Sequence, residues 1–303
     1  MRRFALVWLW LLSQSALAWE AVPQKVADGV YAFIGETGPR TVANEGMNAN
    51  TGFIITDAGV VVIDSGSSRQ VAQKIESAIR QLTPQPITLV INTGGQDHRW
   101  LGNVHFAAQG IPILAHEKTV SDIAERGGMQ AENIGRMLGT TFAGTLVQKP
   151  TRTFTNRETI TLGKETIELI FAGGGHTPGD SIVWLPARRV AFSGDIVYVD
   201  RLLGVLPMSN IGHWLGSFAS LSDLQPGLII PGHGAPASLA KAKKETHDYL
   251  LKLHTHMKQA VAGGDDLQKA INTLDDTALA YLPIYPELRG PNASRAYLEA
   301  EAE

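Results

Sequence analysis

Four short polar clusters combine histidine or aspartate with glycine, and each follows an apolar run that is typical of a strand. They are Asn92-Thr93-Gly94-Gly95-Gln96-Asp97-His98, Gly175-His176-Thr177-Pro178-Gly179-Asp180, Ser193-Gly194-Asp195 and Pro231-Gly232-His233-Gly234. Loops at the ends of strands are where a rigid scaffold presents functional side chains. Imidazole nitrogens and carboxylate oxygens are ligands that Zn²⁺ accepts. The clusters therefore predict a metal site drawn from Asp97, His98, His176, Asp195 and His233.

The composition limits the residue types that can bind a metal in this chain. The 303 residues include no cysteine, which excludes disulfides, thiolate metal sites and iron–sulfur clusters. With 26 Lys and Arg against 29 Asp and Glu, the net charge is −3, and we expect no nucleic-acid partner. Any metal must therefore be held by histidines and carboxylates.

The elements that must position the clusters form two blocks of strands, each followed by helices. In the first block we predict strands at Gly52–Thr56, Val60–Asp64, Ile87–Asn92 and Ile113–Ala115, with helices at Ser67–Leu82 and at 117–138, the latter interrupted at Gly127-Gly128. In the second we predict strands at Thr159–Leu162, Thr166–Phe171, Ser181–Leu185, Arg189–Ser193 and Leu228–Ile230, with helices at His213–Leu224 and Leu239–Val261. Two such blocks predict an α+β fold in which two sheets pack face to face with helices outside, as one domain over residues 19–303.

Both ends of the chain carry segments of another kind. Residues 1–18 have two arginines, an apolar stretch and Ala16-Leu17-Ala18, the order of a secretory signal peptide, so we expect a periplasmic or secreted protein with no membrane span after cleavage. Residues 267–303 form a weaker helical tail. Within it, the run Tyr281–Tyr285 either covers a groove or, as we favour, packs onto the domain.

The order of the clusters resembles the metallo-β-lactamase superfamily. The pair Asp97-His98 is followed by GHTPGD, SGD and PGHG, and the similarity extends from the strand at Gly59–Gly66 to the last loop. The chain is most similar to the zinc metallohydrolases associated with periplasmic quinoprotein systems. This resemblance implies a four-layer αβ/βα sandwich with a metal site at one edge.

The resemblance also implies roles for individual residues. Asp97, His98 and His233 would hold one metal, His176 would belong to a second pocket, and Asp195 would bridge both. Asp64 matches a family aspartate that supports the metal loop from behind. With its bridging role lost, Asp195 could serve as general base, as could His176.

The first loop departs from the family pattern T-H-x-H-x-D-H. Here it runs from Thr93 to His98, which we interpret as one residue shorter and lacking both leading histidines. His98 is the first histidine in the chain, so nothing upstream replaces them. The second pocket keeps only His176 and Asp195, with Gln96 as a weak oxygen ligand, which is fewer than the three protein ligands of a catalytic zinc. We therefore expect one zinc ion rather than two.

The predicted function is that of a periplasmic zinc-dependent hydrolase of a small molecule. A water activated by the metal would attack an ester, thioester, lactone or amide carbonyl. The alternative is a catalytically weak or inactive binding protein on the same scaffold, acting in a periplasmic oxidation system. The missing histidines favour the alternative, whereas the five remaining ligand residues favour the enzyme, which we prefer.

Overall fold

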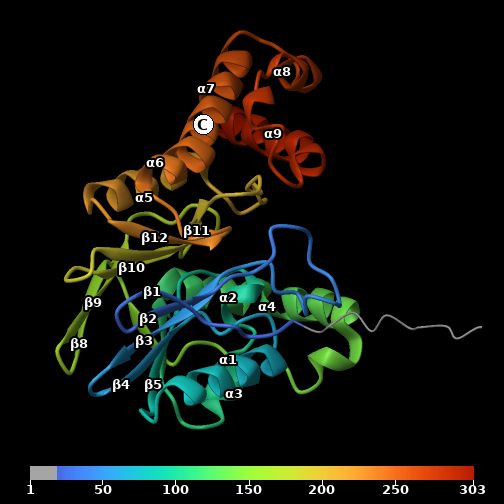
Figure 1. Ribbon diagram of the computed structural model, residues 1–303. Coiled ribbons are helices and arrows are strands. Elements are labelled where there is room, and N and C mark those ends of the chain that lie inside the picture. The colour runs from blue at the N-terminus through green and yellow to red at the C-terminus, as the bar shows by residue number, and fades with distance from the viewer. Residues whose placement is uncertain (1–18) are drawn as a thin grey trace, which may run out of the picture.

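The computed structural model describes residues 19–303, and the predicted signal segment of residues 1–18 lies outside them. Two sheets pack face to face, and helices cover their outer faces (Figure 1). The predicted four-layer α+β sandwich is therefore confirmed. Within residues 19–303, none of the helices combines the length and the apolar character needed to cross a membrane.

The first sheet contains seven strands in chain order. They are β1 (Gln24–Ala27), β2 (Val30–Phe33), β3 (Thr51–Thr56), β4 (Gly59–Ile63), β5 (Ile87–Asn92), β6 (Ile113–His116) and β7 (Arg152–Phe154). Strands β1 to β4 pair antiparallel, and β4 to β7 pair parallel. Their helices are α1 (Arg69–Leu82), α2 (Asp97–Trp100), α3 (Asn103–Ala107) and α4 (Glu117–Leu138), followed by the 3₁₀ turn η1 (Gly139–Phe142). Helix α1 starts at the N-cap Ser68, whose hydroxyl accepts from Val71 N, as the capping serines predicted.

Helix α4 is continuous, so the predicted interruption at Gly127-Gly128 is wrong. A Cβ at Gly127 would come within 3.2 Å of Trp100 and Ile123. The glycine therefore allows α4 to pack closely against Trp100, and this close packing outweighs the weak helix propensity of glycine.

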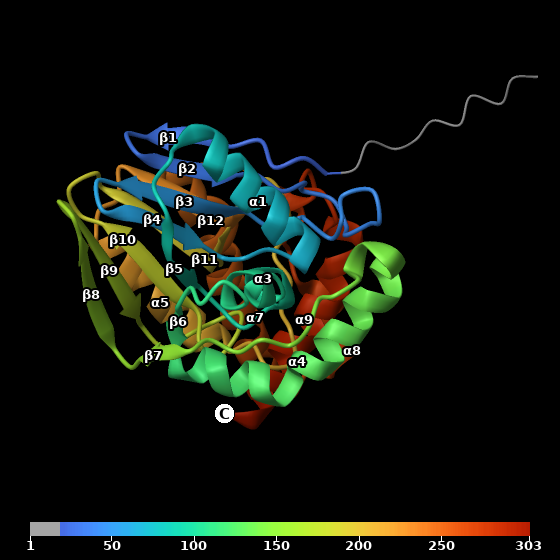
Figure 2. The same cartoon turned by 90° about the horizontal axis from the view of Figure 1, so that it is seen from below.

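The second sheet has the strand order β12-β11-β10-β9-β8. Its strands are β8 (Arg157–Leu162), β9 (Glu165–Phe171), β10 (Ser181–Leu185), β11 (Val190–Tyr198) and β12 (Leu228–His233). The helices that follow are α5 (Ile211–Asp223), α6 (Leu239–Ala242), the π-helical turn η2 (Lys243–His247), α7 (Asp248–Ala262), α8 (Leu267–Thr273), the 3₁₀ turn η3 (Thr277–Leu279) and α9 (Tyr285–Ala302). Figure 1 shows α7, α8 and α9 gathered at one end of the molecule, beyond α5 and α6, and Figure 2, seen from below, shows α1 and α3 covering the first sheet.

Strand β11 is longer than predicted, because it continues from Ser193 to Tyr198. Its pairing with β12 shifts register on both sides of Gly194, which has a φ of 49° that glycine adopts readily. The strand thus passes through the irregularity, and Asp195 lies inside it. Strand β12 likewise extends to His233, and it tolerates Pro231 because it is an edge strand.

The hydrophobic core lies in three main layers. Between the sheets pack residues such as Ile54, Val61, Leu169 and Phe192, while separate clusters fill the spaces under α1 and under α5, α7 and α9. The two sheets are joined at one edge, where Asn50 N donates to Gly232 O at 2.8 Å. The ends of β5, β11 and β12 meet near this edge, and the polar clusters lie there.

Candidate metal centre

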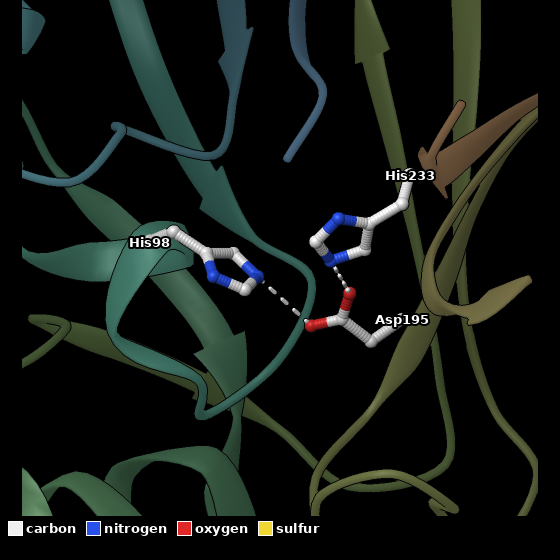
Figure 3. A group of neighbouring side chains, drawn as sticks. All are labelled: His98, Asp195 and His233. Carbon is white, nitrogen blue, oxygen red and sulfur yellow. Dashed lines mark hydrogen bonds and ion pairs between the residues drawn. The ribbon is translucent and has the colours of Figure 1, made fainter. Parts of the chain in front are cut away.

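Three of the predicted ligands converge. A nitrogen of His98, a nitrogen of His233 and a carboxylate oxygen of Asp195 all lie within 4.8 Å of one another, and all three residues are buried. His98 Nε2 is 3.2 Å from Asp195 Oδ2, and His233 Nε2 is 3.2 Å from Asp195 Oδ1. Figure 3 shows each ring directed at a different oxygen of the carboxylate. Asp97 and His176 are not part of this group.

One ring nitrogen of His233 is buried and has no hydrogen-bond partner. Its Nδ1 lies 2.5 Å from the carbonyl oxygen of Asn48, which can only accept, so Nδ1 carries the proton. Burial lowers the pKa of His233 well below its usual value, so the ring is neutral. Its Nε2 therefore carries a lone pair that faces a carboxylate oxygen of Asp195, and this nitrogen has no hydrogen-bond partner. A cation between these atoms would satisfy both.

Beneath the group, the side chain of Arg99 is buried and uses all five of its donors. Nε and Nη2 bind the two carboxylate oxygens of Asp195 at 3.1 and 2.6 Å. Nη1 binds Asp64 at 3.0 Å, and the remaining donors bind the carbonyls of Asn50 and Gly232. Although burial opposes ionisation, Arg99 and His98 hold the pKa of Asp195 well below its usual value, so Asp195 is charged and its orientation is set.

Asp64 fulfils the supporting role that the resemblance implied. Its carboxylate accepts from Thr93 N at 2.7 Å and from Thr93 Oγ1 at 2.8 Å, in addition to Arg99. Asp64 also has a φ of 60°, which aspartate tolerates better than most residues. It thereby fixes the start of the first loop.

Asp97 is held by an arginine that the sequence did not indicate. Arg40, from the loop between β2 and β3, lies 2.6 Å from Asp97 Oδ1 and also donates from Nη2 to His98 Nδ1 at 2.9 Å. Burial by itself raises the pKa of Asp97, but Arg40 and His98 outweigh this effect and lower the pKa below its usual value. The expected ligand Asp97 is thus engaged in an ion pair beside His98, because its position on α2 directs it to the loop of Arg40.

His176 forms a pair with a tyrosine. Its Nδ1 lies 3.0 Å from Gly204 O, so Nδ1 carries the proton and Nε2 accepts from the hydroxyl of Tyr198 at 3.3 Å. Burial lowers the pKa of His176 to about 4, which keeps the ring neutral at neutral pH. The Tyr198 ring stacks on His233 with 4.4 Å between centroids. His176 therefore orients Tyr198 rather than joining the group of His98, Asp195 and His233.

The two glycines of the first loop are required by their neighbours. A Cβ at Gly94 would collide with the carboxylate of Asp180, and a Cβ at Gly95 would collide with that of Asp122. A side chain at either position would therefore require these carboxylates to move.

A cavity of about 440 Å³ opens above the group. Its polar lining includes His98, His176, Tyr198, His233 and Arg201. Gln96 also contributes, and its Oε1 is buried without a hydrogen-bond partner. Trp100 and Met47 are fully buried in the core and do not line this cavity.

Sequence reasoning did not identify Arg99, Arg40, Tyr198 and Arg201. Charge balance offered a signal for Arg99, since two aspartates predicted to be buried require a cation, and an arginine follows His98 directly. Tyr198 and Arg201 follow Asp195 closely, but the strand was expected to end before them. Arg40 gave no local signal, because its loop reaches the site only through the tertiary fold.

The chain belongs to the metallo-beta-lactamase superfamily, whose family model matches residues 45–233. It is similar to a metallo-beta-lactamase type 2 of Elizabethkingia meningoseptica, with 23% identity over 69% of this chain and 77% of that protein. It is also similar to the 2,4-dinitroanisole O-demethylase subunit alpha of Nocardioides sp. (strain JS1661), with 27% identity over 69% of this chain but only 54% of that protein. Among solved structures, a metallo-beta-lactamase from Pontibacter korlensis superposes with a TM-score of 0.62 and 21% identity over 76% of this chain and 98% of that one, which supports the fold.

We predict that Arg99→Ala destabilises the protein by about 3–5 kcal/mol, because two buried carboxylates lose their counter-ion. Arg99→Lys should recover only part of this, since one ammonium cannot replace five directed donors. Urea unfolding of the three proteins at neutral pH measures the effect. A loss below about 1 kcal/mol in Arg99→Ala would show that the network contributes little.

Asp180 should make stability depend on pH. Burial and the nearby charge of Asp195 raise its pKa to about 8, so the native state holds a proton that the unfolded chain releases above about pH 4. This contribution to stability is fully present below about pH 4 and is lost as the pH rises through about 8. In urea unfolding of the metal-free protein, Asp180→Asn should remove this decline, because asparagine stays neutral. An unchanged decline in Asp180→Asn would assign it to another group.

Proposed function

We propose that this protein is a metallohydrolase that uses one zinc ion, held by His98, Asp195 and His233, to cleave a small-molecule ester, thioester, lactone or amide. The observation that carries the proposal is the buried Nε2 of His233, a lone pair aimed at a charged carboxylate with no hydrogen-bond partner. Membership of the superfamily supports hydrolysis as the reaction class.

The donor set fits zinc in number and spacing. Two ligands at about 2.0–2.1 Å from a tetrahedral zinc lie roughly 3.3 Å apart. Each histidine nitrogen lies 3.2 Å from an oxygen of Asp195, His98 from Oδ2 and His233 from Oδ1. Three protein ligands leave a fourth position open, as in catalytic rather than structural sites. The cavity above the group gives a substrate access to that position.

His98 must rearrange its proton to become a ligand. Its Nδ1 accepts from Arg40, so its Nε2 now carries the proton and donates to Asp195. Binding a metal through Nε2 requires that proton on Nδ1, where Asp97 Oδ1 lies 3.5 Å away and can accept it. In this proposal Asp97 orients His98, as carboxylates behind metal-binding histidines commonly do.

A zinc ion in this position supplies a low-pKa water and polarises a substrate carbonyl. The protein supplies the rest of the chemistry. The hydroxyl of Tyr198 lies in the cavity, and His176 Nε2 holds its proton in a hydrogen bond. Turning that hydroxyl toward the substrate would give a donor to the carbonyl oxygen as its negative charge develops. Burial and Asp195 raise the pKa of Tyr198 well above its usual value, so the hydroxyl keeps its proton for this role.

We further propose a periplasmic or secreted location, because residues 1–18 carry the pattern of a signal peptide. The second candidate function is that of a binding protein without catalysis. The observation favouring it is that Arg99 and Arg40 already neutralise Asp195 and Asp97, so the site needs no metal for its charge balance.

Metal analysis separates the two candidates. We expect about one zinc ion per chain after dialysis of the zinc-loaded protein, and almost none in His98→Ala and His233→Ala. His254→Ala is the matched control, because His254 belongs to the second acidic and histidine cluster with Glu299 and Glu303. If only His254→Ala lost its zinc, the cluster of His254, Glu299 and Glu303 would be the zinc site instead. Absence of zinc from the unmodified protein would favour the binding protein.

Tyr198→Phe should lower kcat on an ester substrate by roughly 100-fold, in the range for losing one oxyanion donor. Zinc content and KM should change little, because the ring and its stacking on His233 remain. Tyr281→Phe is the control, since Tyr281 is exposed and does not line the cavity. An unchanged kcat in Tyr198→Phe would show that the hydroxyl of Tyr198 does not take part in the reaction.

A further inference from the structure

The C-terminal segment, which lies beyond the residues matched by the family model, forms one wall of the cavity. Ile284, just before α9, and Leu288, in its first turn, line the cavity together with Leu206 of the loop between β11 and α5. Each of the three is half-buried in the free protein. Within the run Tyr281–Tyr285, Leu282 and Tyr285 are buried in the hydrophobic core, so the run packs onto the domain as we favoured, and only Ile284 of this run also lines the cavity.

The backbone at Ile284 adopts an unusual conformation. Its φ is 58° and its ψ is 14°, a left-handed region that β-branched residues seldom enter. The turn is held on both sides, since Leu202 N donates to Pro283 O and Leu288 N donates to Ile284 O. Glycine or asparagine would adopt this conformation with less strain, but only a larger side chain such as that of isoleucine can form part of the apolar cavity wall.

The cavity lining also includes a buried cation, Arg201, that has no counter-ion among residues 19–303. Arg201 is only 7% exposed, and no ion pair within residues 19–303 includes it. Its Nη1 approaches Gly38 O at 3.3 Å and His233 Nδ1 at 3.4 Å, while its Nε is buried without a partner. A guanidinium in this state is suited to a carboxylate.

We propose that the cavity binds an aliphatic acyl group, with its chain against Ile284, Leu288 and Leu206 and its carbonyl end near Arg201. The inference rests on the proposed function, because the cavity is then the substrate site. Hydrolysis adds water across the bond between the acyl carbon and the leaving group, which departs with one proton, and it produces a carboxylate beside Arg201. Glu287 lies on the apolar wall and repels a carboxylate, so the charged end is directed toward Arg201.

Calorimetric titration of the metal-free full chain with straight-chain carboxylates from acetate to decanoate tests this arrangement. We expect affinity to rise by up to about fourfold for each added CH₂ until the apolar wall is covered. Ile284→Gly and Leu288→Ala should flatten this dependence, whereas Arg201→Gln should weaken all chain lengths by a similar factor. Leu298→Ala is the control, because Leu298 is an exposed leucine of the same helix outside the cavity.

The variant Ile284→Gly also separates an effect on binding from an effect on folding. Glycine adopts the positive φ readily, so the thermal midpoint of this variant should not fall. Affinity that does not depend on chain length, or an unchanged dependence in both wall variants, would overturn the proposal. Because metal is absent from this titration, failure here leaves the zinc-dependent hydrolysis standing. Conversely, loss of zinc or hydrolysis would leave the measured acyl preference in place.

Discussion

The buried guanidinium of Arg99 is the interaction on which the rest of the site depends. It joins Asp64 at the end of β4, Asp195 in β11, and the carbonyls of Asn50 and Gly232. These groups come from both sheets and from the loop before β3. A buried charge is stable only when its hydrogen bonds and counter-charges are complete. The two sheets must therefore meet at this edge in one register, and that register determines where His98 and His233 point.

The charges of the site explain why the ligands can stay close together without a metal. Arg99 compensates Asp195, and Arg40 compensates Asp97, so neither buried carboxylate is left alone. Burial keeps His176 and His233 neutral, which avoids repulsion with the arginines. Among the three converging residues, His233 Nε2 is left without a hydrogen-bond partner, and a cation bound there would satisfy it. The protein is thus preorganised for a ligand without a large electrostatic penalty in its absence.

In the proposed function, the metal ligands and the apolar substrate wall come from two different parts of the chain. The region matched by the superfamily model supplies His98, Asp195 and His233, together with the arginine beneath them. The helices after β12 add the apolar wall around Ile284, and η2 connects them to the second sheet through hydrogen bonds between Thr246 and Tyr198. Helices α7 and α9 pack on each other, and the wall is held by a core that they share with α5 and the second sheet.

The sequence by itself determined the fold class, the superfamily and the four clusters that hold the site, because alternating apolar patterns and glycine-flanked polar residues are local properties. It also determined that the leading histidines are absent. Only the tertiary structure decided that His98 joins Asp195 and His233, while Asp97 turns to Arg40. Adjacent residues of a short helix point in different directions, and which one meets β11 depends on how the sheets pack. Arg201 and Ile284 could not be predicted from the sequence for the same reason, because their roles depend on contacts between segments far apart in the chain.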